Sequence, residues 1–219
     1  MLRIVAILAA LAITGPALAA DIPVKAPPKR PTVYDWTGFY IGAQAGYLWG
    51  RARVVENGVV TDPNAPINGF IGGGLAGANW QNGALVLGVE GDIGFTRAHG
   101  TGVAVAQPNL YDIKWTSHLR GRFGYASDNL LFFVAGGLAV ADFKFTEGGG
   151  GPLTGQKFVG GSLGGGVEYG FTRNVTGRVE YLYDYFGSKT YVIGVDTYNV
   201  RLTGSTLRGA LTVKLWDGH

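Results

Sequence analysis

Residues 175–185 alternate between two kinds of side chain. Positions Val175, Gly177, Val179, Tyr181, Tyr183 and Tyr185 are apolar, aromatic or glycine, and the intervening positions are Thr176, Arg178, Glu180, Leu182 and Asp184. The same alternation occurs in residues 111–125 and 207–215. A period of two residues predicts β-strands that have one apolar face and one polar face.

The breaks between these segments are of two kinds that alternate along the chain. Short polar turns occur at 81–83, 127–129 and 172–174, and longer connections occur near 50–66, 98–110, 146–156 and 187–198. This punctuation predicts eight strands near 36–49, 67–80, 84–97, 111–126, 130–145, 157–171, 175–186 and 199–216. All nine prolines fall outside these ranges, as expected for a sheet closed on itself. The facing of 67–80 and 130–145 is left unassigned.

Eight antiparallel strands fit either a soluble barrel with an apolar interior or an outer-membrane barrel with an apolar exterior. Aromatic residues favour the membrane, because they gather near both strand ends as interfacial girdles do. The first girdle comprises Trp36, Trp80, Tyr125, Phe171 and Trp216, and the second comprises Trp49, Tyr111, Trp115 and Tyr185. We therefore predict an all-β, eight-stranded antiparallel transmembrane β-barrel with short periplasmic turns and long extracellular loops.

The N-terminal region predicts export rather than a folded element. Residues 1–19 combine a positive Arg3, a short apolar core and a small-residue cleavage site, which is typical of a cleaved signal peptide. Residues 20–35 carry four prolines and should form an extended periplasmic leader, so the barrel domain is expected at 36–219.

Charges on the proposed inward faces balance. The acids are Glu90, Asp92, Asp112, Glu168, Glu180 and Asp184, and the bases are Lys114, Arg120, Arg122, Arg178, Arg208 and Lys214. An eight-stranded barrel is only wide enough for side chains to fill, and buried charges need partners. We expect a lumen packed by ion pairs; the alternatives are a narrow general-diffusion porin and a surface binding module that acts through the loops.

The composition offers little for catalysis or for a cofactor. There is no cysteine and there are only three histidines, and the small net charge of +3 does not indicate nucleic-acid binding. Gly160–Gly164 fits G-x-S-x-G but lies inside a predicted strand, and His118 points away from its neighbour Ser117. We predict no enzyme activity, no cofactor and no metal site.

Four segments resemble the small outer-membrane immunogenic proteins, a porin-type family within the OmpA-like β-barrel superfamily. They are WTGFYIGAQAGYLWG (36–50), GALVLGVEGDIGFT (83–96), GSLGGGVEYGFTRNVTGRVEYLYDYFG (161–187) and LRGALTVKL (207–215). The resemblance implies a structural surface antigen in the outer membrane of a Gram-negative bacterium, with no catalytic residues. Its expected partners are outer-membrane lipid, lipopolysaccharide and the barrel-assembly machinery.

The resemblance also bears on both termini. Barrels of this kind usually end on a phenylalanine that the assembly machinery reads, whereas this chain has Leu215 followed by Trp216. Some related barrels are attached to peptidoglycan through a mature N-terminal Ala-Asp. Cleavage after residue 19 would expose Ala20 and Asp21, which are therefore candidates for such a tether.

Overall fold

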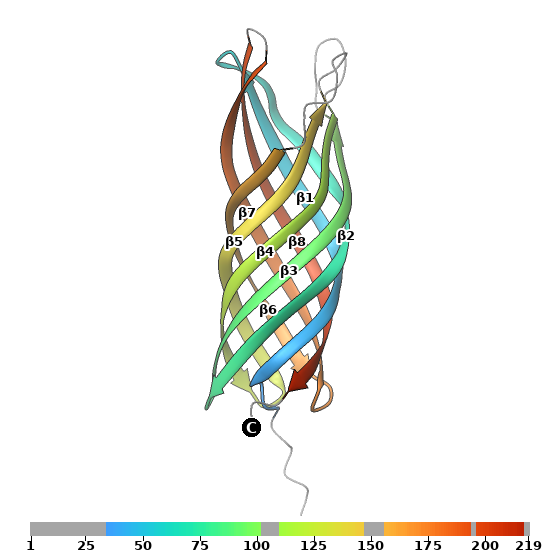
Figure 1. Ribbon diagram of the computed structural model, residues 1–219, viewed down its shortest axis with the longest axis vertical. Helices are drawn as coiled ribbons and strands as arrows, with labels where there is room; N and C mark the ends of the chain where they lie inside the picture. Colours follow the sequence, from blue (N-terminus) through green and yellow to red (C-terminus); the bar gives the residue numbers. More distant parts are fainter. Residues whose placement is uncertain (1–33, 102–109, 147–155, 194–195, 217–219) are drawn as a thin grey trace, which may run out of the picture. The chain divides into compact units, whose positions relative to one another are not determined.

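The computed structural model describes residues 34–101, 110–146, 156–193 and 196–216. They form a closed antiparallel barrel in which each strand pairs with its neighbours in chain order and β8 pairs with β1 (Figure 1). The strands are β1 (Gly38–Glu56), β2 (Val59–Asn82), β3 (Leu85–Thr101), β4 (Leu110–Ser127), β5 (Leu130–Thr146), β6 (Gln156–Gly170), β7 (Val175–Ile193) and β8 (Asp196–Trp216). The predicted fold class, strand number and closure are confirmed. Within these residues no helix is long and apolar enough to cross a membrane.

Two of the predicted long connections are instead strand. β1 and β2 continue through 50–66 to a tight turn in which Asn57 and Gly58 both have positive φ (49° and 83°), and β7 and β8 continue to Ile193 and Asp196. A two-residue turn with positive φ at both positions suits a hairpin. The loop prediction was wrong for 50–66 because apolar side chains turn inward in this extension, where Ala52, Val54 and Ala65 are buried.

The prediction that every proline lies outside the strands is wrong in the β1–β2 extension, because Pro63 and Pro66 lie within β2. Pro63 sits beside a register shift between Ala52 and Val54 of β1, where the ladder is interrupted. Pro66 pairs with β1, and the ladder from β2 to β3 begins one residue later at Ile67. Each proline therefore occupies a place where a missing N–H costs no ladder hydrogen bond.

The barrel has two ends, which we name by their connections. The short-turn end carries the turns after β2, β4 and β6, and the long-hairpin end carries the connections after β1, β3, β5 and β7. The outer wall between them is apolar, with large exposed side chains such as Phe39, Leu87, Phe123, Leu163 and Leu211. This pattern is the reverse of a soluble protein and suits a lipid environment.

The aromatic girdles are largely as predicted. Trp80, Tyr125 and Phe171 are exposed near the short-turn end, and Trp49 and Tyr185 are exposed toward the long-hairpin end. Trp36 is a correction, because it lies before β1 and does not follow the alternation of the strand. Its side chain is 3% exposed inside the end of the barrel, and its ring centroid lies 4.5 Å from that of Tyr34. Trp115 is half-buried, and the side chains of Tyr111 and Trp216 lie outside the described set.

The two strands of unassigned facing have apolar residues on both faces. In β5, Leu131, Phe133 and Ala135 point inward whereas Phe132 and Val134 point outward. In β2, Ile67, Ile71 and Leu75 point inward. Alternation of polarity could not reveal the facing because neither strand has a polar face over these stretches.

Candidate functional site: the packed lumen

A cluster of charged side chains fills the middle of the barrel. It is built from β3, β4, β6, β7 and β8, whose inward positions at this level are acidic or basic. Glu90 on β3 is fully buried and accepts hydrogen bonds from Arg178 (2.6 and 2.8 Å), Arg120 (2.8 Å) and the Tyr40 hydroxyl (2.9 Å). Charge-assisted bonds of this length are the strong class, so Glu90 is the hub of the cluster.

A second hub is Asp92, two residues further along β3. Arg208 donates to both of its oxygens (3.1 and 3.0 Å), and His118 Nδ1 lies 2.9 Å from Oδ1. His118 Nε2 lies 3.2 Å from Asp184 Oδ2. Both ring nitrogens thus face carboxylates, and only an imidazolium can donate to both.

The cluster is continuous across the lumen. Arg120 joins Glu90 to Glu180, which also pairs with Arg208 at 2.9 Å. On the short-turn side, Arg122 donates to Glu168 (2.7 Å) and lies 4.3 Å from the Phe133 ring centroid. With His118 charged, five carboxylates face five cations: Glu90, Asp92, Glu168, Glu180 and Asp184 against Arg120, Arg122, Arg178, Arg208 and His118.

The structure brings most of the sequence-predicted lumen charges into this cluster: Glu90, Asp92, Arg120, Arg122, Glu168, Arg178, Glu180, Asp184 and Arg208. Asp112 and Lys114 are corrections, because register shifts between Phe95 and Ala98 and between Ile113 and Trp115 invert the facing of the first residues of β4. Ile113 is buried in their place, and Asp112 instead pairs with His99 on the outer surface at 2.5 Å.

Lys214 is buried but lies apart from the cluster, at the short-turn end. Its ammonium donates to the Asp35 carbonyl oxygen (2.6 Å) and lies 5.0 Å from the Tyr34 ring centroid. Lys214 therefore fixes the segment before β1 inside the barrel. The alternation within the strands could not predict this role, because the contacted residues lie outside them.

The predicted set of lumen residues was limited to charged side chains and left out several neutral members of the cluster. Thr176 donates to Glu168 (2.5 Å) and lies 2.6 Å from the Thr212 hydroxyl, while the Gln44 amide lies 3.3 Å from Asp92. Tyr40 also contacts Arg122 at 2.7 Å. All four lie at inward positions of β1, β7 and β8, so extending the alternation to polar uncharged residues would have found them.

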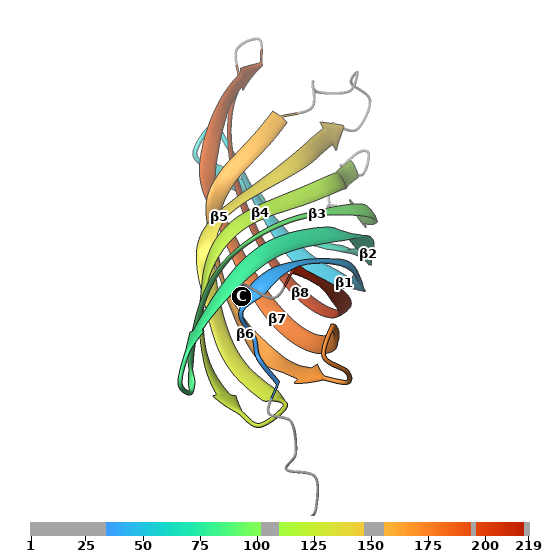
Figure 2. The same ribbon diagram turned by 60° about the horizontal axis from the view of Figure 1, so that its bottom comes forward.

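Apolar layers close the lumen on both sides of the charges. Toward the long-hairpin end lies a core of fifteen buried residues that includes Ile67, Phe143, Phe158, Phe186 and Leu202. At the short-turn end, Tyr34 and Trp36 pack with Val86, Ala126, Leu131, Phe133 and Ala135. Figure 2 shows the short-turn end, where β1 begins. The interior is thus a sandwich of apolar, ionic and apolar layers, whereas the sequence indicated only the ionic one.

Neither serine singled out in the sequence is placed as a nucleophile. Ser117 donates to the Asp92 carbonyl oxygen (2.8 Å) and is not paired with His118, and Ser162 lies in the middle of β6 rather than at a strand-to-helix turn. In the described part of the chain, no group of three or more His, Asp or Glu side chains is disposed to hold a metal ion. The groups bind one another and thereby pack the interior.

The chain is similar to known outer-membrane proteins. Residues 5–207 match the family described as the outer membrane protein beta-barrel domain. The 25 kDa outer-membrane immunogenic protein of Brucella canis is 31% identical over 94% of this chain and 91% of its own length. The 22 kDa outer membrane protein of Rhizobium leguminosarum bv. viciae is 29% identical over 82% and 78%. The crystal structure of Neisserial surface protein A aligns with 82% of this chain and 98% of its own, with 17% identity and a TM-score of 0.48.

Proposed function

The chain belongs to the outer-membrane β-barrel family and is an outer-membrane protein of Gram-negative type, and from that premise we propose that it is a sealed structural barrel. In this proposal its short-turn end faces the periplasm and its long-hairpin end faces the outside, as in other outer-membrane barrels. It serves the envelope as a rigid surface-exposed body and does not pass solutes.

The observation that carries this proposal is the three-layered lumen. A hydrated ion crossing the barrel would have to displace the Phe143–Phe158 layer, whose rings meet edge to face at 5.4 Å. It would then have to separate the Glu90 and Arg178 side chains, which are 0% and 1% exposed. Breaking a buried pair costs about 3–5 kcal/mol, and several pairs would have to open together.

Single-channel recording of the refolded mature chain in a planar bilayer tests the proposal. We expect no conductance steps from protein whose insertion is verified independently by protease protection of the membrane-embedded part. Discrete, reproducible openings would refute the sealed lumen and would favour the narrow general-diffusion porin.

We also propose a periplasmic tether, because the chain enters the barrel at the short-turn end through the buried Tyr34 and Trp36. Ala20 and Asp21 lie outside the described residues, so the tether remains a proposal from the sequence. Mass spectrometry of the cell-wall fraction should find Ala20 linked through its amine to peptidoglycan. Recovery of only a free Ala20 amine would refute it.

A further inference from the structure

The outer surface of β1 and β8 carries three arginines just beyond the lipid-facing wall. Arg51, Arg53 and Arg201 are exposed, and Arg53 is the direct cross-strand partner of Arg201. Like charges directly opposite each other destabilise a strand pair. Within the described ranges none of the three forms an ion pair, so the site concentrates positive charge that an anion would neutralise.

Two other outward cations near this end of the barrel have acidic cross-strand partners. On β4, β5 and β6, Asp112 is the cross-strand partner of Lys144, and Asp142 is the partner of Lys157. Opposite charges in such positions stabilise the sheet and offset each other. Arg97 and Lys114 are exposed cations as well, and what distinguishes the β1–β8 site is that two of its arginines are direct cross-strand partners.

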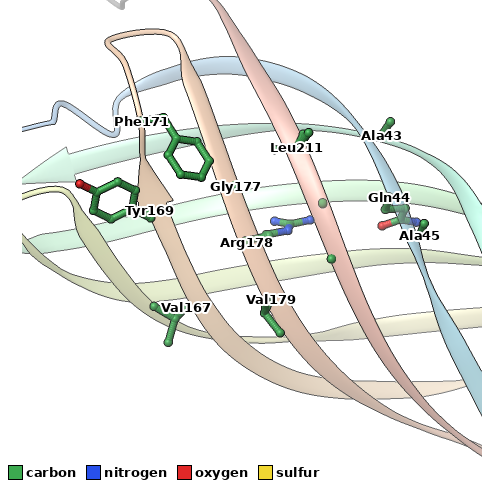
Figure 3. A pocket seen from close by; sticks show the side chains of 12 residues that line it. Ala43, Gln44, Ala45, Val167, Tyr169, Phe171, Gly177, Arg178, Val179 and Leu211 are labelled. Carbon is green, nitrogen blue, oxygen red and sulfur yellow. The ribbon is translucent and has the colours of Figure 1, made fainter.

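A shallow groove lies on the same strands, in the lipid-facing wall. Ala45 of β1 and Gly209 of β8 are cross-strand partners and form the floor shared by two adjoining depressions of about 660 and 730 Å³. Figure 3 shows the first, where Tyr169 and Phe171 stand toward the β6–β7 hairpin and Val179 lies further along. The second is bounded by Tyr47 and Phe70, whose rings meet at 5.2 Å.

The height between the groove and the arginines is close to half the thickness of the apolar band of a membrane barrel. Arg51 follows Ala45 by six residues, which is about 20 Å along the strand and about 15 Å in height at a tilt of ~40°. Half of the apolar band of an outer-membrane barrel is about 12 Å. Tyr47 and Trp49, which lie between them on β1, are the kind of residue found at the membrane interface. The arginines thus reach headgroup level when the groove lies near the bilayer centre.

We propose that this face binds one phosphorylated lipid of the leaflet on the long-hairpin side. Its phosphate lies between Arg51, Arg53 and Arg201, and one acyl chain lies in the groove over Ala45 and Gly209. Guanidinium groups suit this ligand because they bind phosphate oxygens in pairs. The assignment to the outer leaflet rests on the proposed orientation of the barrel, whereas the site itself rests on the charges and the groove.

Native mass spectrometry of the refolded mature chain in neutral detergent tests the phosphate contact, with bisphosphorylated lipid A, dephosphorylated lipid A and inorganic phosphate as probes. The double variant Arg53→Gln/Arg201→Gln should bind lipid A at least about tenfold more weakly, since it loses two charge-assisted contacts to the phosphate. Arg173→Gln, an exposed cation at the short-turn end, is the matched control and should bind as the parent does. Dephosphorylated lipid A should not distinguish the double variant from the parent.

A second pair of variants tests the groove. A Cβ at Gly209 would approach nothing closer than the Arg178 carbonyl oxygen at 3.7 Å, so Gly209→Leu should fold and fill the groove. It should weaken binding of both lipid A forms, while Gly121→Leu, on an outward position of β4 with similar room (3.9 Å to the Gly136 carbonyl oxygen), should not.

Equal lipid A binding by the parent and the arginine double variant would overturn the proposal, and so would displacement of lipid A by equimolar inorganic phosphate. An inert Gly209→Leu would overturn the acyl-chain assignment. None of these readouts depends on whether the lumen conducts.

Discussion

Glu90→Gln is the most direct test of the ionic layer. The substitution keeps the shape of the side chain and removes one negative charge from a balanced buried set. The Glu90 carboxylate accepts hydrogen bonds from Arg178, Arg120 and Tyr40. A glutamine has an NH2 group in place of one carboxylate oxygen, and this group would face N–H donors of the arginines with no acceptor between them. Breaking a buried pair typically costs about 3–5 kcal/mol, because the partner charge stays buried. We expect Glu90→Gln to lower the free energy of unfolding by that amount.

The assay is reversible urea unfolding of the refolded barrel in lipid vesicles, followed by tryptophan fluorescence. Asp142→Asn, which removes a half-buried charge from the outer surface, is the matched control and should change the free energy by less than about 1 kcal/mol, as exposed pairs do. The double variant Glu90→Gln/Arg178→Met restores the charge balance and should recover part of the loss. A Glu90→Gln barrel within about 1 kcal/mol of the parent would refute the idea that these charges depend on one another.

Three further predictions concern packing and turns. Gly46→Ala should prevent refolding into the heat-modifiable form seen by gel mobility, because its Cβ would lie 2.2 Å from the Leu207 carbonyl oxygen, whereas Gly204→Ala, with open space around it, should refold normally. Phe158→Ala should lower the free energy of unfolding in urea by about 3–5 kcal/mol, since the side chain is fully buried. A loss below about 1 kcal/mol would show that the apolar layer toward the long-hairpin end is loosely packed. Gly58→Val should destabilise the β1–β2 hairpin, because φ is 83° there, and should speed proteolysis at that turn; unchanged cleavage would contradict the turn assignment.

The sequence predicts the strand number, closure and most of the ionic layer because in β3, β7 and β8 one face is apolar and the other charged. It does not predict the facing of residues 112–114 of β4, because the register shift between Ile113 and Trp115 inverts the side chains on its N-terminal side, while those from Thr116 onward face as predicted. It also misplaces Trp36, which lies outside the regular strand. The extension near 50–66 was missed because on β1 its apolar side chains face inward and its charged side chains face outward, the opposite of the rest of that strand.

That reversal of polarity within single strands has a consequence for the bilayer. On β1 the outward residues are apolar or aromatic from Phe39 to Trp49 and basic at Arg51 and Arg53, and a membrane-spanning strand needs about 9–11 residues. Sinking the barrel would carry the arginines into hydrocarbon, at up to about 2–4 kcal/mol each at the midplane, and raising it would expose apolar wall to water. We therefore expect the protein to have one preferred depth in the bilayer. A bilayer of different hydrophobic thickness must deform around it to relieve the hydrophobic mismatch.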